Sequence, residues 1–145
     1  MSSTNPAHAL ARFVIDFDLD QVPATLVARA KLSILDALGI GLASQNYDFA
    51  HVTANAISEL AGPGTFPVIG STKRLPQRDA AHLNGTLIHG LDFDDTHSEA
   101  VVHTSASAVP TMLMSGLATK IKGRQALSGF LIPSVLASRL GAAAR

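Results

Sequence analysis

The stretch PATLVARAKLSILDALGIGLAS, from Pro23 to Ser44, decides the class of fold. Apolar side chains recur along it at helical spacing, and Pro23 stands where the first turn of a helix tolerates proline. Its second half, from Leu38 to Ala43, is apolar on nearly every side. Glycines in such a segment cost about 1 kcal/mol each relative to alanine unless close packing compensates. The pattern therefore predicts a long α-helix that is buried against other helices.

Further helices are predicted before and after this one. Apolar periodicity and turn signals place them at residues 6–15, 49–60, 77–90, 105–121 and 124–144. Asp48 is expected to cap the second of these helices. Pro110 and Pro133 are expected to lie near first turns or to introduce kinks.

One stretch of the chain is predicted to be extended. Thr65-Phe-Pro-Val-Ile-Gly70 has the composition of a strand, and Pro67 restricts that strand to a sheet edge or a connector. A single short strand cannot form a sheet, and no repeat or linker divides the chain. We therefore expect an all-α helical bundle formed by one domain that covers residues 1–145.

Composition excludes several classes of function. Eleven Lys and Arg balance eleven Asp and Glu, and the basic runs typical of nucleic-acid binding are missing. The chain is 47% hydrophobic, yet no uninterrupted apolar run approaches the ~20 residues of a membrane span. It contains no cysteine for disulfides or thiolate metal sites, and its start lacks the pattern of a signal peptide. We expect a cytoplasmic protein that binds neither nucleic acid nor membrane.

A cluster of chemically active residues follows the helix predicted at 77–90. The segment Asn84-Gly-Thr-Leu-Ile-His-Gly-Leu-Asp-Phe-Asp-Asp-Thr-His97, with His103 after it, contains three Asp and three His in a chain that is only 15% charged. Neighbouring carboxylates repel one another, so a solvated surface is a poor explanation for this concentration. The cluster predicts a site for a small molecule.

The predicted helices suggest how this site is built. His82 and His89 are seven residues apart and hence share a helix face, and Gly85 lets another backbone or a ligand approach that face closely. His103 precedes Thr104-Ser-Ala-Ser107, whose hydroxyls and free amides at a helix start favour an anion. A substrate carboxylate fits between the two helices.

Three other interpretations of the same residues are open. An acidic loop holds Mg²⁺ or Ca²⁺ in some all-α enzymes, but the spacing here is not that of a calcium loop and no phosphate-binding loop accompanies it. Histidines with carboxylates bind Zn²⁺ in other proteins, although no His pair here has the i, i+4 spacing with Glu. In the third interpretation Asp94 or Asp95 caps a helix and the histidines bond buried carbonyls. We expect no metal.

Four segments resemble the MmgE/PrpD family, which includes 2-methylcitrate dehydratase, cis-aconitate decarboxylase and iminodisuccinate epimerase. They are Val22-Pro-Ala-Thr-Leu-Val-Ala-Arg-Ala-Lys-Leu-Ser-Ile-Leu-Asp-Ala-Leu-Gly39, Asp79-Ala-Ala-His-Leu-Asn-Gly85, His89-Gly-Leu-Asp-Phe-Asp-Asp-Thr-His97 and His103-Thr-Ser105. The resemblance implies a cofactor-free, usually dimeric enzyme with a large helical domain, a smaller α/β lid and a cleft between them. This chain resembles the N-terminal part of the helical domain, without the C-terminal remainder and the lid.

The resemblance also implies roles for individual residues. Asp92, Thr96 and His103 match residues that line the family's substrate site. We expect His103 and Asp92 to be catalytic, and the residues expected to bind substrate are Thr96, His97, Asp95 and Ser105. We expect Lys73, Arg74 and Arg78 to face solvent.

The expected activity is that of a lyase, or part of one, that abstracts a proton next to a carboxylate of a small polycarboxylate. Dehydration of 2-methylcitrate or citrate, as in propionate metabolism, is the first expectation, and a related decarboxylase or epimerase is the alternative. A different alternative is an inactive fragment or partner module that needs a C-terminal half. We expect either a homo-oligomer or association with that half.

Overall fold

The computed structural model describes residues 5–144, and within them helices carry nearly all of the regular structure. Their order along the chain is α1 (Pro6–Ile15), the 3-10 turn η1 (Leu19–Gln21), α2 (Ala24–Ser44), α3 (Asp48–Leu60), β1 (Phe66–Pro67), β2 (Arg74–Leu75), α4 (Gln77–His89), α5 (Ser105–Thr119) and α6 (Gly123–Ala143). The predicted all-α fold is confirmed.

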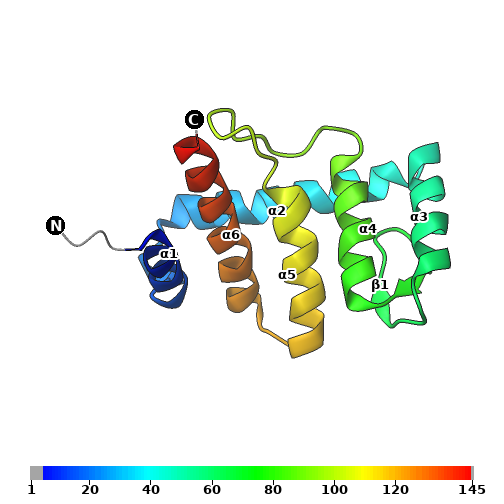
Figure 1. Ribbon diagram of the computed structural model, residues 1–145, viewed down its shortest axis with the longest axis horizontal. Coiled ribbons are helices and arrows are strands. Elements are labelled where there is room, and N and C mark those ends of the chain that lie inside the picture. Colours follow the sequence, from blue (N-terminus) through cyan, green and yellow to red (C-terminus); the bar gives the residue numbers. More distant parts are fainter. Residues whose placement is uncertain (1–4, 145) are drawn as a thin grey trace.

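The helices form one row that is crossed by α2. Figure 1 shows α6, α5, α4 and α3 side by side, with α2 running across them, and α2 contacts α4, α5 and α6. Small residues line the inner side of α2, where Ala30, Ala37 and Gly41 are buried. Ser44, at the end of the helix, is also buried and donates a hydrogen bond from Oγ to the carbonyl oxygen of Leu87 on α4. Small side chains thus let α2 approach the row closely.

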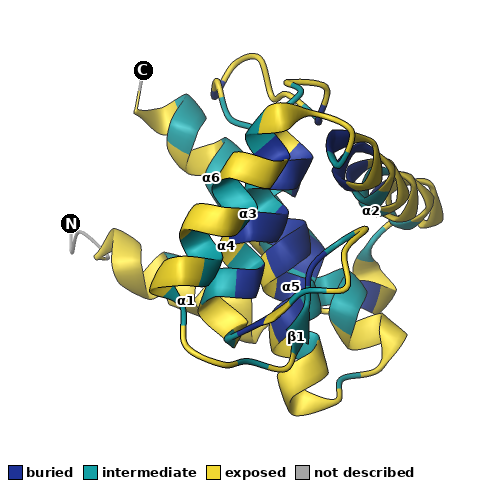
Figure 2. Cartoon of the chain, turned by 90° about the vertical axis from the view of Figure 1, so that its right-hand side faces the viewer, coloured by how far each residue is buried: buried dark blue, intermediate teal, exposed yellow. Residues whose placement is uncertain are grey.

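The predicted packing of α2 against other helices is confirmed, but only one side of the helix is covered although its second half is apolar on nearly every side. Leu32, Leu35 and Leu42 each expose more than half of their surface. Figure 2 shows this outer side of α2 as a largely exposed band, with the buried residues turned toward the other helices. The reason is geometric, since α4, α5 and α6 all lie against the same face of α2.

The core is centred on α4. Leu83, Leu87 and Ile88 expose at most 1% of their surface and belong to two adjoining apolar clusters, one with α3 and the β strands, the other with α2, α5 and α6. Full burial of such side chains contributes about 1.5–3 kcal/mol each. Helix α4 is therefore the most firmly held element, and its C-terminal end carries the candidate site.

A small hairpin packs beside α4. Phe66 pairs with Leu75 and Pro67 with Arg74 in an antiparallel two-stranded sheet, so the expected edge strand exists and has a partner that the sequence did not predict. Buried Asn84 donates from Nδ2 to the Pro67 carbonyl oxygen at 3.0 Å and accepts at Oδ1 from the Ile69 amide at 2.8 Å. Asn84 is thus a structural residue that fastens this connection to α4.

The expected cap at Asp48 is wrong, and so is one of the two alternatives for the prolines, a place near the first turn of a helix. The other alternative, a kink, stays a prediction. Tyr47, with extended backbone angles, is the N-cap of α3, while Asp48 is its first helical residue and no side chain caps this end. Pro110 and Pro133 lie inside α5 and α6, beyond their first turns. Because Pro110 has no N–H, the Ala106 carbonyl lacks its usual helical donor. That carbonyl oxygen would lie 2.9 Å from a Cβ at position 85, so Gly85 makes the close approach of α4 and α5 possible.

Helix α6 is the one described helix that is long and apolar enough to cross a membrane by length and composition alone. Such a helix also occurs in the cores of soluble proteins, so the observation is weak evidence. Here α6 packs against α5 and α2 and contributes Phe130 to the core. Phe130 is the one buried residue of α6, so packing within the described bundle covers only part of its apolar surface.

Candidate active site

A pocket of about 620 Å³ opens between the C-terminal half of α4 and the first turns of α5. This volume lies within the range of small-molecule sites. The residues that line it are Ala81, His82, Gly85, Thr86, His89, Gly90, His103, Ala106, Ser107, Pro110 and Thr111. Its ionisable lining groups are the three imidazoles, which confirms that His82 and His89 share the face of α4 that points toward the site.

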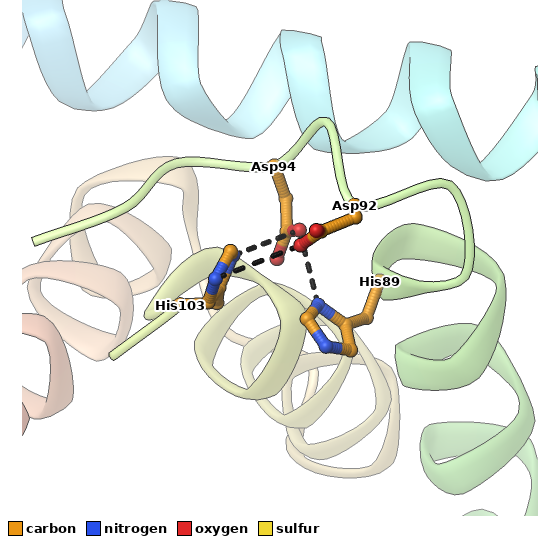
Figure 3. Close-up of side chains that lie close together, drawn as sticks. All are labelled: His89, Asp92, Asp94 and His103. Atoms are coloured by element: carbon orange, nitrogen blue, oxygen red, sulfur yellow. Dashed lines mark hydrogen bonds and ion pairs between the residues drawn. The ribbon is translucent and has the colours of Figure 1, made fainter. Parts of the chain in front are cut away.

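Asp94 lies at the centre of the site. Its side chain has no exposed surface, and its Oδ1 atom is 3.1 Å from Nδ1 of His89 and 3.1 Å from Nδ1 of His103. Figure 3 shows the carboxylate between the two rings, with His89 on the end of α4 and His103 on the segment that enters α5. One buried carboxylate oxygen therefore connects the two helices through their histidines.

These contacts set the orientation of both histidine rings. An ionised carboxylate only accepts hydrogen bonds, so each Nδ1 carries the hydrogen and the Nε2 atom of each ring is left for other partners. The rings meet edge to face with their centroids 4.8 Å apart. The arrangement gives two pre-oriented imidazoles on one wall of the pocket, as a carboxylate does for the histidine of a catalytic triad.

Asp92 reaches the same cluster from a less enclosed position. Its side chain is 81% exposed, and its Oδ1 lies 3.7 Å from Nε2 of His103, which is too far for a hydrogen bond. The backbone of Asp92 is left-handed, with φ of 55°, and its amide donates to the His89 carbonyl oxygen at 2.8 Å. This tight turn at the end of α4 brings Asp92 and His103, the two expected catalytic residues, near each other.

Asp95 holds the start of α5. Its Oδ1 accepts from the Ser105 amide at 2.8 Å, and its Oδ2 accepts from Oγ1 of Thr104 at 2.7 Å. A carboxylate at this place satisfies an amide that has no partner within the helix and complements the helix dipole. Ser105 is buried and does not line the pocket. These contacts are those of a helix start, and the substrate-binding roles of Asp95 and Ser105 stay predictions.

Thr96 and His97 lie farther along the loop, and both are exposed. His97 accepts a hydrogen bond at Nδ1 from the Ala100 amide and pairs with Val102 through a single bridge. Neither residue lines the pocket. Their predicted contacts with substrate therefore depend on a ligand that extends beyond this pocket toward the loop.

The cluster also has the composition of a cation site. His89, Asp92, Asp94 and His103 each offer one donor atom, and these atoms lie within 4.8 Å of one another. A divalent cation bound to Oδ1 of Asp94 would compete with the two Nδ1–H groups for that oxygen. Oδ1 of Asp94 has two hydrogen-bond partners, and the expectation that no metal takes part stays a prediction.

The structure identifies Asp94 as a central residue that the sequence did not single out for chemistry. Three aspartates within four positions carry no sequence signal that distinguishes the buried one. The histidines bond this carboxylate and not buried carbonyls. Lys73 contacts Asn55 and Ser58 of α3, away from the pocket. Arg78 is paired with Asp79 and lines an adjoining cavity that shares Ala81 and Thr111 with the pocket.

Comparison with known proteins agrees with the resemblance in the motifs. The sequence model of the MmgE/PrpD N-terminal domain matches residues 8–144. The cis-aconitate decarboxylase-like protein oryM of Aspergillus oryzae is 29% identical over 140 residues, which are 94% of this chain and 29% of that protein. Cis-aconitate decarboxylase of Aspergillus terreus is 28% identical over 122 residues, or 84% of this chain and 24% of the relative.

The human cis-aconitate decarboxylase is 33% identical over 88 residues, which are 60% of this chain and 18% of that enzyme. The chain thus spans less than a third of the length of each of these curated relatives.

Proposed function

The chain belongs to the MmgE/PrpD family, and on that premise we propose that it carries part of the active site of a lyase for small polycarboxylates. The observation that carries the proposal is the pair of imidazoles held by buried Asp94 at the wall of an open pocket. Proton transfer at carbon needs a group with a free nitrogen or proton in a fixed orientation. His103 meets that need at Nε2, which has Asp92 nearby.

Two reactions fit this group of residues. In decarboxylation a carbon–carbon bond breaks, CO₂ leaves, and the electron pair that stays behind is taken up by a proton delivered to carbon. In dehydration a base removes a proton next to a carboxylate and the hydroxyl group leaves with a proton. Both require one acid–base group and a setting that tolerates developing negative charge, and His103 is proposed as that group.

Decarboxylation of a cis-aconitate-like tricarboxylate is our first choice between them. The relatives that support it are the decarboxylases of Aspergillus terreus and human and the decarboxylase-like protein of Aspergillus oryzae. Dehydration of citrate or 2-methylcitrate, the first expectation from the family resemblance, is the second candidate. In either case we propose a cytoplasmic enzyme that works without a cofactor, as a dimer or together with a C-terminal half.

Replacement of His103 tests the proposed function. We expect His103→Gln in the full-length protein to lower kcat by about 10²-fold or more, because the group that moves the proton is lost. Turnover of cis-aconitate, citrate, 2-methylcitrate and iminodisuccinate should be followed by NMR, since the products identify the reaction. His51→Gln is the matched control, as His51 is exposed on α3 and does not line the pocket.

Turnover by the His103→Gln protein within a few-fold of the wild type would contradict the assignment of His103. No turnover of any of the four substrates by the wild-type protein would favour the alternative of an inactive fragment or partner module.

A further inference from the structure

His89 has the position of a second functional histidine. It is the last residue of α4, it lines the pocket together with His103, and its side chain is 52% exposed. Its Nδ1 is bonded to Asp94, so its ring is held while its Nε2 edge is unused by that contact. A core histidine would be enclosed, whereas His89 is fixed at one nitrogen and half-exposed at the pocket, which suits a binding role.

The two histidine rings share the single negative charge of Asp94. Both Nδ1 atoms bond the same oxygen of Asp94, which carries one negative charge. Asp94 can neutralise one imidazolium, and two imidazolium rings with centroids 4.8 Å apart would repel each other unless the Asp92 carboxylate, 3.7 Å from Nε2 of His103, offsets the second charge. Within the described residues no Lys or Arg lines the pocket itself, and Arg78 lines the adjoining cavity, so an anionic ligand inside the pocket meets imidazoles.

The two rings differ in what lies at Nε2. Nε2 of His103 has the Asp92 carboxylate 3.7 Å away, whereas the contact of His89 with Asp94 uses Nδ1. The His89 side chain is also the more exposed, at 52% against 26%. The Nε2 edge of His89 is therefore open to a ligand, and an imidazolium N–H at that edge donates well to a carboxylate.

We propose that His89 binds a carboxylate group of the substrate through Nε2, with Asp94 as the residue that positions its ring. The inference rests on the proposed function for the identity of the substrate class. It assigns substrate binding to His89 and leaves proton transfer to His103. Each of the two histidines that bond Asp94 thus has a role of its own.

The test uses two amide replacements of His89, each of which keeps a hydrogen-bonding nitrogen at the position of one of the two ring nitrogens. In His89→Asn the amide nitrogen takes the place of Nδ1, so the bond to Asp94 is kept and the Nε2 donor is lost. In His89→Gln the amide nitrogen takes the place of Nε2, so the donor toward the substrate is kept and the bond to Asp94 is lost. His51→Asn on α3 is the control for a histidine outside the pocket.

Binding should be measured with tricarballylate, a saturated tricarboxylate that can be neither dehydrated nor converted by loss of an activated carboxylate. We expect His89→Asn to raise its Kd about tenfold or more, as loss of a charge-assisted hydrogen bond does, and His89→Gln to raise it less. In the full-length protein His89→Asn should raise KM for cis-aconitate more than it lowers kcat, in contrast to His103→Gln.

The reverse order, with His89→Asn harmless and His89→Gln damaging, would mean that His89 only supports Asp94, and it would overturn the inference. Unchanged Kd and KM in His89→Asn would overturn it as well, while leaving the proposed lyase function in place. Binding that depends on His89 in a protein without turnover would support the inference and reject the proposed function. If the wild type neither binds tricarballylate nor turns over cis-aconitate, both proposals fail.

Discussion

At the scale of single residues, the charge of Asp94 is the feature on which the site depends. The side chain has no exposed surface, and within the described part of the structure its Oδ2 atom has no hydrogen-bond partner. Isolated buried charges are unfavourable, so this carboxylate costs stability that its two imidazole bonds offset only in part. We therefore expect Asp94 to act through the two histidine rings that it bonds.

Asp94→Asn tests that statement. The amide oxygen can still accept from both Nδ1 atoms, but the negative charge that supports a protonated imidazole is gone. We expect kcat of the full-length protein to fall by about 10²-fold or more, as happens when the aspartate of a catalytic triad is replaced by asparagine. Glu99→Gln, an exposed carboxylate in the same loop, is the control.

Amide NMR spectra of Asp94→Asn should show that the fold is retained, so that loss of activity reports on charge. A variant that turns over substrate within threefold of the wild type would show that the charge of Asp94 is dispensable.

At the scale of elements, the loop from α4 to α5 is held at both ends. Asp95 fastens its near end to the start of α5 through Thr104 and Ser105. On the other side Ala100 packs so closely on α6 that a Cβ at Gly141 would lie 2.7 Å from its methyl carbon. The loop that carries Asp92 and Asp94 is thus a fixed connection between three helices.

Removal of the Asp95 carboxylate should loosen this connection. We expect Asp95→Ala to lower the free energy of unfolding by about 1–2 kcal/mol, the usual effect of deleting a helix N-cap group. Thermal and denaturant unfolding followed by circular dichroism measure the change, with Glu99→Ala as the surface control. A difference from that control below about 0.3 kcal/mol would mean that the Asp95 contacts do not hold α5.

The helices themselves could be predicted from the sequence because each is specified by its own periodicity. The ends of the predicted 77–90 helix and the class of fold agree with the structure, and His82, His89 and His103 do line one pocket. Contacts set by nonlocal geometry could not be predicted. The pairing of Phe66 with Leu75, the burial of Asp94 and the exposed side of α2 all depend on how separate segments meet.

At the scale of the whole molecule, the outer side of α2 is an uncovered apolar stripe. Leu32, Leu35 and Leu42 recur at helical spacing and are all exposed. Contiguous exposed apolar surface marks sites of association in soluble proteins. The chain spans less than a third of its curated relatives, and a stripe of this kind is suited to covering by further polypeptide or by a second copy.

We expect this chain on its own to self-associate through the stripe, and the double change Leu32→Gln with Leu35→Gln to weaken that association by tenfold or more in Kd. Each leucine removed from such a contact contributes about 1.5–3 kcal/mol when it is fully buried. Analytical ultracentrifugation over a range of concentrations measures it, with Leu60→Gln on α3 as the control. A wild-type chain that stays monomeric throughout would contradict the prediction.

The cluster of His89, Asp92, Asp94 and His103 is drawn from one short stretch of consecutive residues, 89–103, flanked by two helices that pack on each other. Groups this close in sequence meet without closure of a long loop, so bringing them together costs little chain entropy. Their final arrangement still depends on the packing of α4, α5 and α6 around the stretch. A change in α6 that displaces Ala100 should therefore alter the histidines from a distance.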